Sequence, residues 1–226
     1  MMQVSIVIPT LDERNHIGLL LSDLEPLRQT GHEVIIADGA STDGTRTLAG
    51  ARADRLLLAP QGRASQMNAG AGTATGDVLW FLHADSRVLP RAQSQLLDAC
   101  RTGAIWGRFD VRLAGHRPLL RLVERMMNWR SRLTGIATGD QGIFVTRAAF
   151  EAVGGFPPIP LMEDVALSKA LRRQARPVCL SGPILTSSRR WEENGILSTI
   201  LLMWRLRLAY ALGADPRRLA DLYGRR

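Results

Sequence analysis

The 226-residue sequence has few cysteines and no long apolar run. Its two cysteines, Cys100 and Cys179, fit no metal or redox spacing, which implies no disulfide framework and favours a reducing compartment. A membrane-spanning helix needs about 20 apolar residues, and the nearest candidate, residues 196–212, is interrupted by Arg205 and Arg207. The N-terminus lacks a basic region followed by an apolar stretch, so we expect no signal peptide. These absences predict a cytoplasmic protein.

Lysine is also nearly absent, since all but one of the 29 basic residues are arginine, the exception being Lys169. The basic residues outnumber 21 acidic ones and give a net charge of +8. Arginine binds phosphate through paired hydrogen bonds, so the bias suits a phosphorylated ligand. An anionic surface, or the composition of the source genome, explains it equally well. The arginines are scattered and form no platform with aromatic residues, so we expect no nucleic-acid binding.

Hydrophobic periodicity predicts alternating strands and helices in the first half of the chain. Strands are expected at residues 4–8, 33–37, 55–58 and 78–82, and helices at residues 17–27, 41–51, 64–71 and 91–100. This alternation predicts an α/β fold with a mostly parallel, Rossmann-like sheet flanked by helices. The second half is less regular. It is expected to hold strands at 106–113 and 142–146, a helix with a basic face at 119–133, and further helices at 148–153, 165–173, 196–212 and 216–223.

Polar side chains follow three of the predicted strands at the point where each strand ends. Among them are Thr10, Glu13, Asp38 and Asp85. Carboxyl ends of parallel strands meet at one edge of a sheet, and ligands of open α/β sheets bind there, so we expect a shared site. Helix capping and turn formation are the alternative for the acids, and they are the main expectation for Asp43.

Three other segments carry residues suited to anion binding or acid–base chemistry. Arg63 stands in a glycine-flanked segment that enters a helix, where an anion site and a solvated surface arginine are equally consistent with the sequence. Glu163 and Asp164 begin a helix after a proline-rich loop, which suits a general base but also helix capping. The Arg-Arg-Trp run at 189–191 suits a diphosphate clamp or sugar stacking, and equally a solvated turn.

The order and spacing of these motifs resemble those of family 2 glycosyltransferases, which are inverting enzymes of the GT-A fold. The resemblance covers almost the whole chain and rests on residues 5–13, 38–45, 83–85, 154–156 and 163–164. More narrowly, the chain is similar to a small bacterial subgroup labelled arsenosugar-biosynthesis glycosyltransferases, at residues 139–142, 162–164 and 187–191.

The resemblance implies one GT-A domain over residues 1–226. Within it, residues 1–102 are expected to be a nucleotide-binding half, 103–194 an acceptor and catalytic half, and 195–226 a C-terminal segment of amphipathic helices. The implied reaction moves a sugar, with inversion, from a nucleotide-diphosphate sugar to an acceptor hydroxyl. Asp38 at the expected base contact makes a UDP-sugar the expected donor.

The resemblance also assigns roles to individual residues. Asp164 looks like the general base, and Glu163 like a neighbour that sets its position or pKa. The expected contacts to the nucleotide sugar are Pro9, Thr10, Leu11, Glu13, Asp38, Arg63, Ala84 and Asp85. The expected contacts to the acceptor or the diphosphate are Asp140, Gln141, Arg189, Arg190 and Trp191.

Two positions depart from the family's motifs. Asp85 resembles the last acid of the Asp-x-Asp motif, which holds a divalent metal, Mn²⁺ or Mg²⁺, against the donor diphosphate, but His83 stands where the first acid would be. Mg²⁺ keeps several waters and Mn²⁺ tolerates an imidazole, so we expect a metal at Asp85 with His83 as a second candidate ligand. Ser187 replaces the glutamine of the Gln-x-x-Arg-Trp motif of processive synthases, which argues against processive polymerisation.

Two other functions remain open on the sequence alone. A sugar nucleotidyltransferase would need a glycine-rich basic loop after the first strand, and residues 9–13 form no such loop. A non-catalytic nucleotide-sugar or membrane-surface binding protein would use the predicted helix at 196–212. There Ile196, Ile200, Met203 and Trp204 are expected to form an apolar face. That face suits peripheral contact with the inner side of a membrane, a homodimer contact, or the core.

Overall fold

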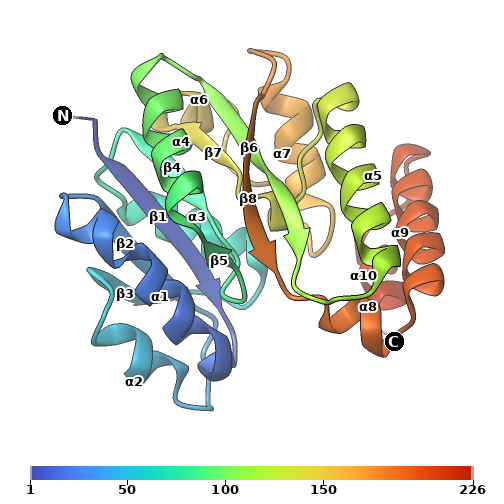
Figure 1. The fold of residues 1–226 in the computed structure, drawn as a ribbon, viewed down its shortest axis with the longest axis horizontal. Helices are drawn as coiled ribbons and strands as arrows, with labels where there is room; N and C mark the ends of the chain where they lie inside the picture. Colours follow the sequence, from blue (N-terminus) through green and yellow to red (C-terminus); the bar gives the residue numbers. More distant parts are fainter. Residues whose placement is uncertain (1, 225–226) are drawn as a thin grey trace.

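The computed structural model describes residues 2–224 and contains a mixed sheet with helices packed against it (Figure 1). The eight strands found in this range lie in the order β3-β2-β1-β4-β7-β6-β8-β5. Four neighbouring pairs are parallel and three are antiparallel. The strands are β1 (Val4–Thr10), β2 (Glu33–Asp38), β3 (Arg55–Leu58), β4 (Val78–Phe81), β5 (Arg87–Val88), β6 (Trp106–Leu113), β7 (Phe144–Thr146) and β8 (Val178–Thr186).

The first half of the chain forms the parallel part of the sheet, as the sequence predicted. β1 pairs with β2 on one side and with β4 on the other, and β2 pairs with β3. In this register Thr10 lies opposite Asp38. β4 ends at Phe81, two residues before His83. The carboxyl ends of β1, β2 and β4 therefore lie at one edge of the sheet.

The second half adds strands of both directions. β7 is antiparallel to β4 and β6, whereas β8 runs parallel to β6. The sequence analysis gives no strand at β8. Between Leu180 and Ile184, β8 has three residues opposite a single residue of β6. This bulge accommodates Gly182 and Pro183, which interrupt the apolar alternation by which a strand is recognised.

The helices cover both faces of the sheet and agree with the predicted ones to within a few residues at each end. The short helix α8 and the 3₁₀ turn η1 (Gly139–Gln141) are additions to the prediction. The helices are α1 (Arg14–Gln29), α2 (Thr45–Gly50), α3 (Arg63–Thr73), α4 (Pro90–Arg101), α5 (Pro118–Thr134), α6 (Arg147–Ala152), α7 (Glu163–Leu171), α8 (Arg189–Glu193), α9 (Ile196–Ala211) and α10 (Pro216–Gly224).

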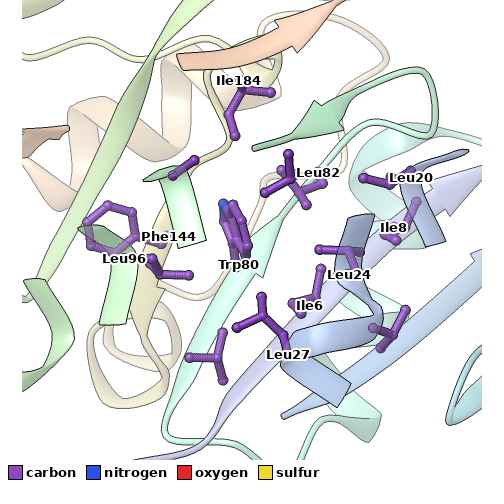
Figure 2. Close-up of a cluster of buried hydrophobic side chains, with 14 of the residues drawn as sticks. Ile6, Ile8, Leu20, Leu24, Leu27, Trp80, Leu82, Leu96, Phe144 and Ile184 are labelled. Carbon is purple, nitrogen blue, oxygen red and sulfur yellow. The ribbon is translucent and has the colours of Figure 1, made fainter. Parts of the chain in front are cut away.

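The core lies on both faces of the sheet because successive residues of a buried strand point to opposite sides. Ile6 and Ile8 of β1 pack with Trp80 against α1 and α4 (Figure 2). Val7, between them, packs on the other face with residues of α3, α6 and α7. α3 approaches β1 closely there, since a Cβ atom on Gly70 would lie 2.5 Å from Cγ1 of Val7. This packing sets the start of α3 near the carboxyl edge of the sheet.

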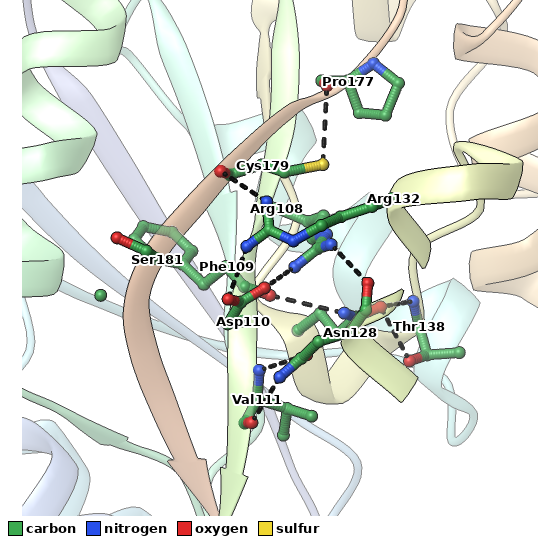
Figure 3. Close-up of polar contacts among 12 residues, drawn as sticks. Arg108, Phe109, Asp110, Val111, Asn128, Arg132, Thr138, Pro177, Cys179 and Ser181 are labelled. Carbon is green, nitrogen blue, oxygen red and sulfur yellow. Dashed lines mark hydrogen bonds and ion pairs between the residues drawn. The ribbon is translucent and has the colours of Figure 1, made fainter. Parts of the chain in front are cut away.

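A buried arginine fastens α5 to β6 (Figure 3). Arg108 is fully buried, forms an ion pair with Asp110, and donates to the carbonyl of Asn128 over 3.0 Å. Arg132 of α5 pairs with the same carboxylate at 2.6 Å. Asn128 also exchanges two hydrogen bonds with the backbone of Val111. Because a buried cation that loses its partners is strongly destabilising, this network holds α5 firmly against the sheet.

Candidate active site

A cavity of about 890 Å³ opens at the carboxyl edge of the sheet. Its walls come from the ends of β1, β4 and β8, the starts of α3 and α7, and the helices α5, α8 and α9. The cavity brings together fourteen of the predicted site residues, although 182 residues separate the first from the last. They are Pro9, Thr10, Leu11, Glu13, Arg63, His83, Ala84, Asp85, Asp140, Glu163, Asp164, Arg189, Arg190 and Trp191.

Asp38 and Gln141 lie beside the cavity rather than in its wall. Asp38 is fully buried and accepts hydrogen bonds from the Thr10 hydroxyl at 2.8 Å, the Ser41 hydroxyl at 2.6 Å and the Ser41 backbone N–H at 2.8 Å. Gln141 is also fully buried and accepts from the backbone N–H of Thr138 at 3.1 Å. Asp38 thus fixes the end of β1, and Gln141 fixes the turn that carries Asp140.

The end of β4 presents a histidine and two nearby acids to the cavity. Burial, together with the positive charge of Arg63, lowers the pKa of His83 to about 3, so its imidazole is neutral. Burial and the charge of Asp85 raise the pKa of Glu13, although His16, 3.1 Å from that carboxylate, works against the rise. A neutral imidazole and carboxylates are donor types that suit a divalent cation.

This donor set suits a metal shared with a ligand better than a protein-only metal centre. Within residues 2–224, His, Cys, Asp and Glu side chains form no group of three or more that could hold a metal ion. Mg²⁺ and Mn²⁺ bind well to one or two carboxylates supplemented by phosphate oxygens and water. The residues at the end of β4 therefore fit a metal whose coordination a diphosphate completes.

Arg63 faces the acids across the cavity. Its position as the first residue of α3 follows from Gly62, whose φ of +131° favours glycine. The Arg63 side chain is accessible within the cavity, and its charge acts on His83, Glu163, Asp164 and Asp85. The sequence left open whether Arg63 belongs to an anion site or is a solvated surface arginine, and its placement in the cavity favours an anion site.

The start of α7 delivers two acids of different character to the same cavity. Glu163 is 5% exposed, and burial followed by the negative charge of Asp164 raises its pKa to about 7, against the opposing effect of Arg63. Asp164 is more accessible and accepts a hydrogen bond from the backbone N–H of Gly139 at 2.8 Å. The pair therefore offers one carboxylate held in place and one carboxyl that can exchange a proton near neutral pH.

Gly139 connects the two sides of the cavity. A Cβ atom at this position would lie 2.5 Å from Nε2 of His83. The same residue donates its backbone N–H to Asp164. Only a residue without a side chain can touch the His83 ring and hold the Asp164 carboxylate in this arrangement. The segment 139–142 carries a recognisable motif, but the sequence alone gives no reason for the glycine.

Sequence reasoning missed two arginines that line the cavity, Arg130 of α5 and Arg207 of α9. Burial, followed by repulsion from Arg207, lowers the pKa of Arg130 to about 10. Burial raises the pKa of the neighbouring Asp140, whose Oδ1 atom is buried without a hydrogen-bond partner among the described residues. The basic face predicted for the helix at 119–133 was the available signal for Arg130. For Arg207 the sequence offered only an interruption of an apolar segment.

The C-terminal helices close one side of the cavity. The Arg190 guanidinium lies 3.4 Å from the ring centroid of Tyr223 in α10 and donates to the Tyr223 carbonyl at 2.6 Å. Tyr223 also lines the cavity. Residues 189–191, for which the sequence left a solvated turn as the alternative, begin the helix α8, whose Arg190 contacts α10.

The apolar face predicted for residues 196–212 divides between the core and the cavity. Ile196 is buried against Leu113, Leu120 and Val123, because α9 packs its first turn between β6 and α5. Ile200, Met203 and Trp204 line the cavity. The exposed apolar stripe of this helix shares Trp204 with the predicted face and otherwise consists of other residues.

Comparisons with known proteins agree with the architecture. Residues 5–150 match the family model described as Glycosyl transferase family 2. An uncharacterized glycosyltransferase of Nostoc sp. is 25% identical over 113 residues, which are 47% of this chain and 35% of that relative. The chain thus matches about a third of the length of this curated relative.

Two solved structures are similar in fold. Staphylococcus aureus TarS, residues 1–349, has a TM-score of 0.70 at 18% identity, over 83% of this chain and 61% of that one. Glucosyl-3-phosphoglycerate synthase from Mycobacterium tuberculosis, in complex with Mn²⁺, UDP and phosphoglyceric acid, has a TM-score of 0.66 at 17% identity. That match covers 95% of this chain and 80% of the synthase. The GT-A fold prediction is confirmed, and the narrower arsenosugar subgroup stays a prediction. The chain belongs to glycosyl transferase family 2.

Proposed function

We propose that the protein is an inverting glycosyltransferase that moves a sugar from a nucleotide-diphosphate sugar to an acceptor hydroxyl. The observation that carries this proposal is the convergence of arginines and two sets of acids in one cavity. Arg63, Glu13 and Asp85 lie near the carboxyl edge of the sheet, and the acids Glu163 and Asp164 lie at the start of α7. The arginines suit a diphosphate, and the acids of α7 suit a general base.

The donor is expected at the sheet edge, with its diphosphate near Arg63 and its nucleotide near Thr10. The accessible guanidinium at the start of α3 favours this orientation, because arginine and a helix N-terminus both stabilise phosphate. TarS has been crystallised with UDP-GlcNAc, and the mycobacterial synthase with UDP. These complexes support a uridine nucleotide as the first donor to test.

Asp164 is the proposed general base. Its carboxylate is fixed by the Gly139 N–H and opens to the cavity. In the proposed step the carboxylate accepts the proton of the acceptor hydroxyl, and the acceptor oxygen forms a bond to the anomeric carbon. The bond from that carbon to the diphosphate oxygen breaks, and the nucleotide diphosphate leaves with the electron pair. Attack opposite to the leaving group inverts the anomeric centre.

Glu163 and Arg63 are proposed to adjust this base. Loss of the Glu163 proton would place a second negative charge beside Asp164, whereas the positive charge of Arg63 offsets the negative charge of both acids. Proton loss from Glu163 near pH 7 would therefore favour transfer of the acceptor proton to this pair of acids.

A divalent metal, Mn²⁺ or Mg²⁺, is proposed to be held by Asp85, with His83 or Glu13 as the second protein ligand. When bound, such an ion would offset negative charge on the diphosphate. The Mn²⁺ in the complex of the mycobacterial synthase supports this choice of ion. Arg63, Arg189 and Arg190 line the same cavity and would stabilise the departing diphosphate.

A panel of nucleotide sugars tests the proposal. We expect one uridine diphosphate sugar to raise the melting temperature, more strongly with Mn²⁺, because ligands that bind only the folded state stabilise it. The same compound should be turned over with water or an added hydroxyl compound as acceptor. The variant Asp85→Asn should weaken the effect of Mn²⁺, while Asp98→Asn, on the exposed surface of α4, serves as the matched control. Binding without turnover of any donor would favour a non-catalytic binding protein.

A further inference from the structure

Two neighbouring helices each expose an apolar stripe that none of the described residues covers. In Figure 1, α5 and α9 lie side by side at one end of the molecule. Their exposed apolar residues recur every three or four positions, so each set occupies one face of its helix. On α5 they are Leu122, Met126, Trp129 and Leu133, between 40% and 66% exposed. On α9 and at its end they are Leu197, Leu201, Trp204, Leu208 and Leu212, between 60% and 80% exposed.

The exposed charges on α5 and α9 themselves are all arginines, whereas exposed acids beside them, such as Glu193, Asp215 and Asp221, lie on the neighbouring segments. The sequence of α9 contains no acidic residue, and the single acid of α5, Glu124, is buried under Arg121. Arg125 and Arg205 are exposed beside the two stripes. Arg217 and Arg218 are exposed at the start of α10, just beyond the end of α9. An apolar face bordered by arginines, without exposed carboxylates on its own helices, complements an anionic and apolar surface.

The cavity opens between the same two stripes. Met126 and Trp129 from α5 and Trp204 from α9 belong to the exposed face and also line the cavity. The exposed tryptophans therefore stand at the rim of the candidate active site. Tryptophan favours the boundary between water and the acyl chains of a bilayer, where its ring is half apolar and half polar.

We propose that the α5–α9 face binds the surface of an anionic lipid bilayer, with the two stripes inserted at the level of the headgroups. This orientation turns the cavity mouth toward the lipid. If the proposed glycosyl transfer is correct, the acceptor is an amphiphile whose apolar chain stays in the bilayer while its hydroxyl-bearing head enters between α5 and α9. The membrane contact itself does not depend on the transferase activity.

A second copy of the chain is a poorer occupant of this face. In a symmetric dimer the same patch faces itself, so arginines such as Arg125 and Arg205 would meet with no acid on either helix to neutralise them. Anionic lipid headgroups supply that negative charge without any special register. Within residues 2–224 no helix is long and apolar enough to cross a membrane, which agrees with contact at the surface.

The test is flotation with vesicles of phosphatidylcholine containing about 30% phosphatidylglycerol, an anionic fraction that gives a strong surface potential. The full chain should float with these vesicles, and less so with pure phosphatidylcholine or at high salt. The double variant Leu201→Gln, Leu208→Gln changes two exposed residues outside the cavity. Its partition coefficient should fall about a hundredfold, since each of the two lost apolar side chains contributes about tenfold. Leu19→Gln with Leu58→Gln, 53% and 62% exposed on α1 and β3, is the matched control and should float like the wild type.

Light scattering and donor hydrolysis distinguish the remaining outcomes. The proposal is overturned if the wild type does not float with anionic vesicles. It is also overturned if the wild type is a dimer in lipid-free buffer that the Leu201–Leu208 variant converts to a monomer. Hydrolysis of the donor in solution should be equal in the wild type and in both variants. If the wild type hydrolyses the donor but does not float, the membrane proposal fails and the proposed enzyme activity stands. If the wild type floats but hydrolyses no donor, the membrane proposal stands and the proposed enzyme activity fails.

Discussion

The raised pKa of the buried Glu163 predicts how the free energy of unfolding changes with pH. Its pKa is raised from 4.5 to about 7 by burial and by Asp164. The folded state therefore holds this proton more tightly than the unfolded state, so its contribution to the free energy of unfolding is full below about pH 4.5. That contribution is lost as the pH rises through 7. A difference of about 2.5 pH units corresponds to about 3 kcal/mol.

The variant Glu163→Gln should not lose this stability as the pH rises, because glutamine has nearly the shape of the protonated acid and cannot ionise. We expect the variant to match the wild type at pH 5 and to be more stable at pH 8 by about 3 kcal/mol, or about 6–12 °C in melting temperature for a chain of this size. Urea unfolding at the two pH values measures the difference. Glu151→Gln, at an exposed position of α6, is the control and should show no such change. Equal stability of Glu163→Gln and the wild type at pH 8 would contradict a raised pKa of Glu163 in the folded state.

Loss of the same proton should also change the reaction rate as the pH rises. Ionisation of Glu163 places a second negative charge beside Asp164 and favours transfer of the acceptor proton to this pair of acids, so kcat/KM should rise through about pH 7. In Glu163→Gln this rise should be absent. A wild-type profile that is flat between pH 6 and 8 would contradict the role proposed for Glu163.

Three further substitutions test the geometry of the site. Gly139→Ala places a Cβ atom 2.5 Å from Nε2 of His83, so donor turnover should fall about tenfold to a hundredfold. Circular dichroism should show little loss of helix content, and unchanged turnover would argue against this packing. Asp38→Asn leaves buried donors without an acceptor and should cost about 1–3 kcal/mol in urea unfolding, whereas an unchanged midpoint would contradict the buried network. Arg190→Ala removes the contacts with Tyr223, so trypsin should cleave within α10 about tenfold faster, and equal cleavage rates would show that α10 is held otherwise.

The parallel half of the fold could be predicted because its signals are local. Each of its strands is a short apolar run followed by a helical period, and the β1–β2–β4 arrangement follows from chain connectivity. Thr10, Glu13 and Asp85 stand at or just after strand ends, and this position predicted that they lie at one edge of the sheet, where the cavity lies. These inferences needed only the rule that the carboxyl ends of parallel strands meet.

The rest depends on tertiary packing that periodicity does not encode. Asp38 also stands at a strand end, yet hydrogen bonds from Thr10 and Ser41 turn its carboxylate away from the cavity. Arg130 and Arg207 reach the cavity because of the way α5 and α9 are placed against the sheet. For the apolar face of α9 the sequence left core, dimer contact and membrane contact open for the same reason, since either apolar side of that helix could have faced outward.

The variant Asp164→Asn separates donor binding from the proton transfer assigned to Asp164. Once a donor is identified, its affinity for the variant is measured by calorimetry, and its transfer rate by product formation on the same preparation. The proposed mechanism predicts donor binding close to that of the wild type and a transfer rate lower by about 10²–10⁴, the usual contribution of a general base. A folded Asp164→Asn variant that transfers sugar at nearly the wild-type rate would remove Asp164 as the base and contradict the proposed mechanism.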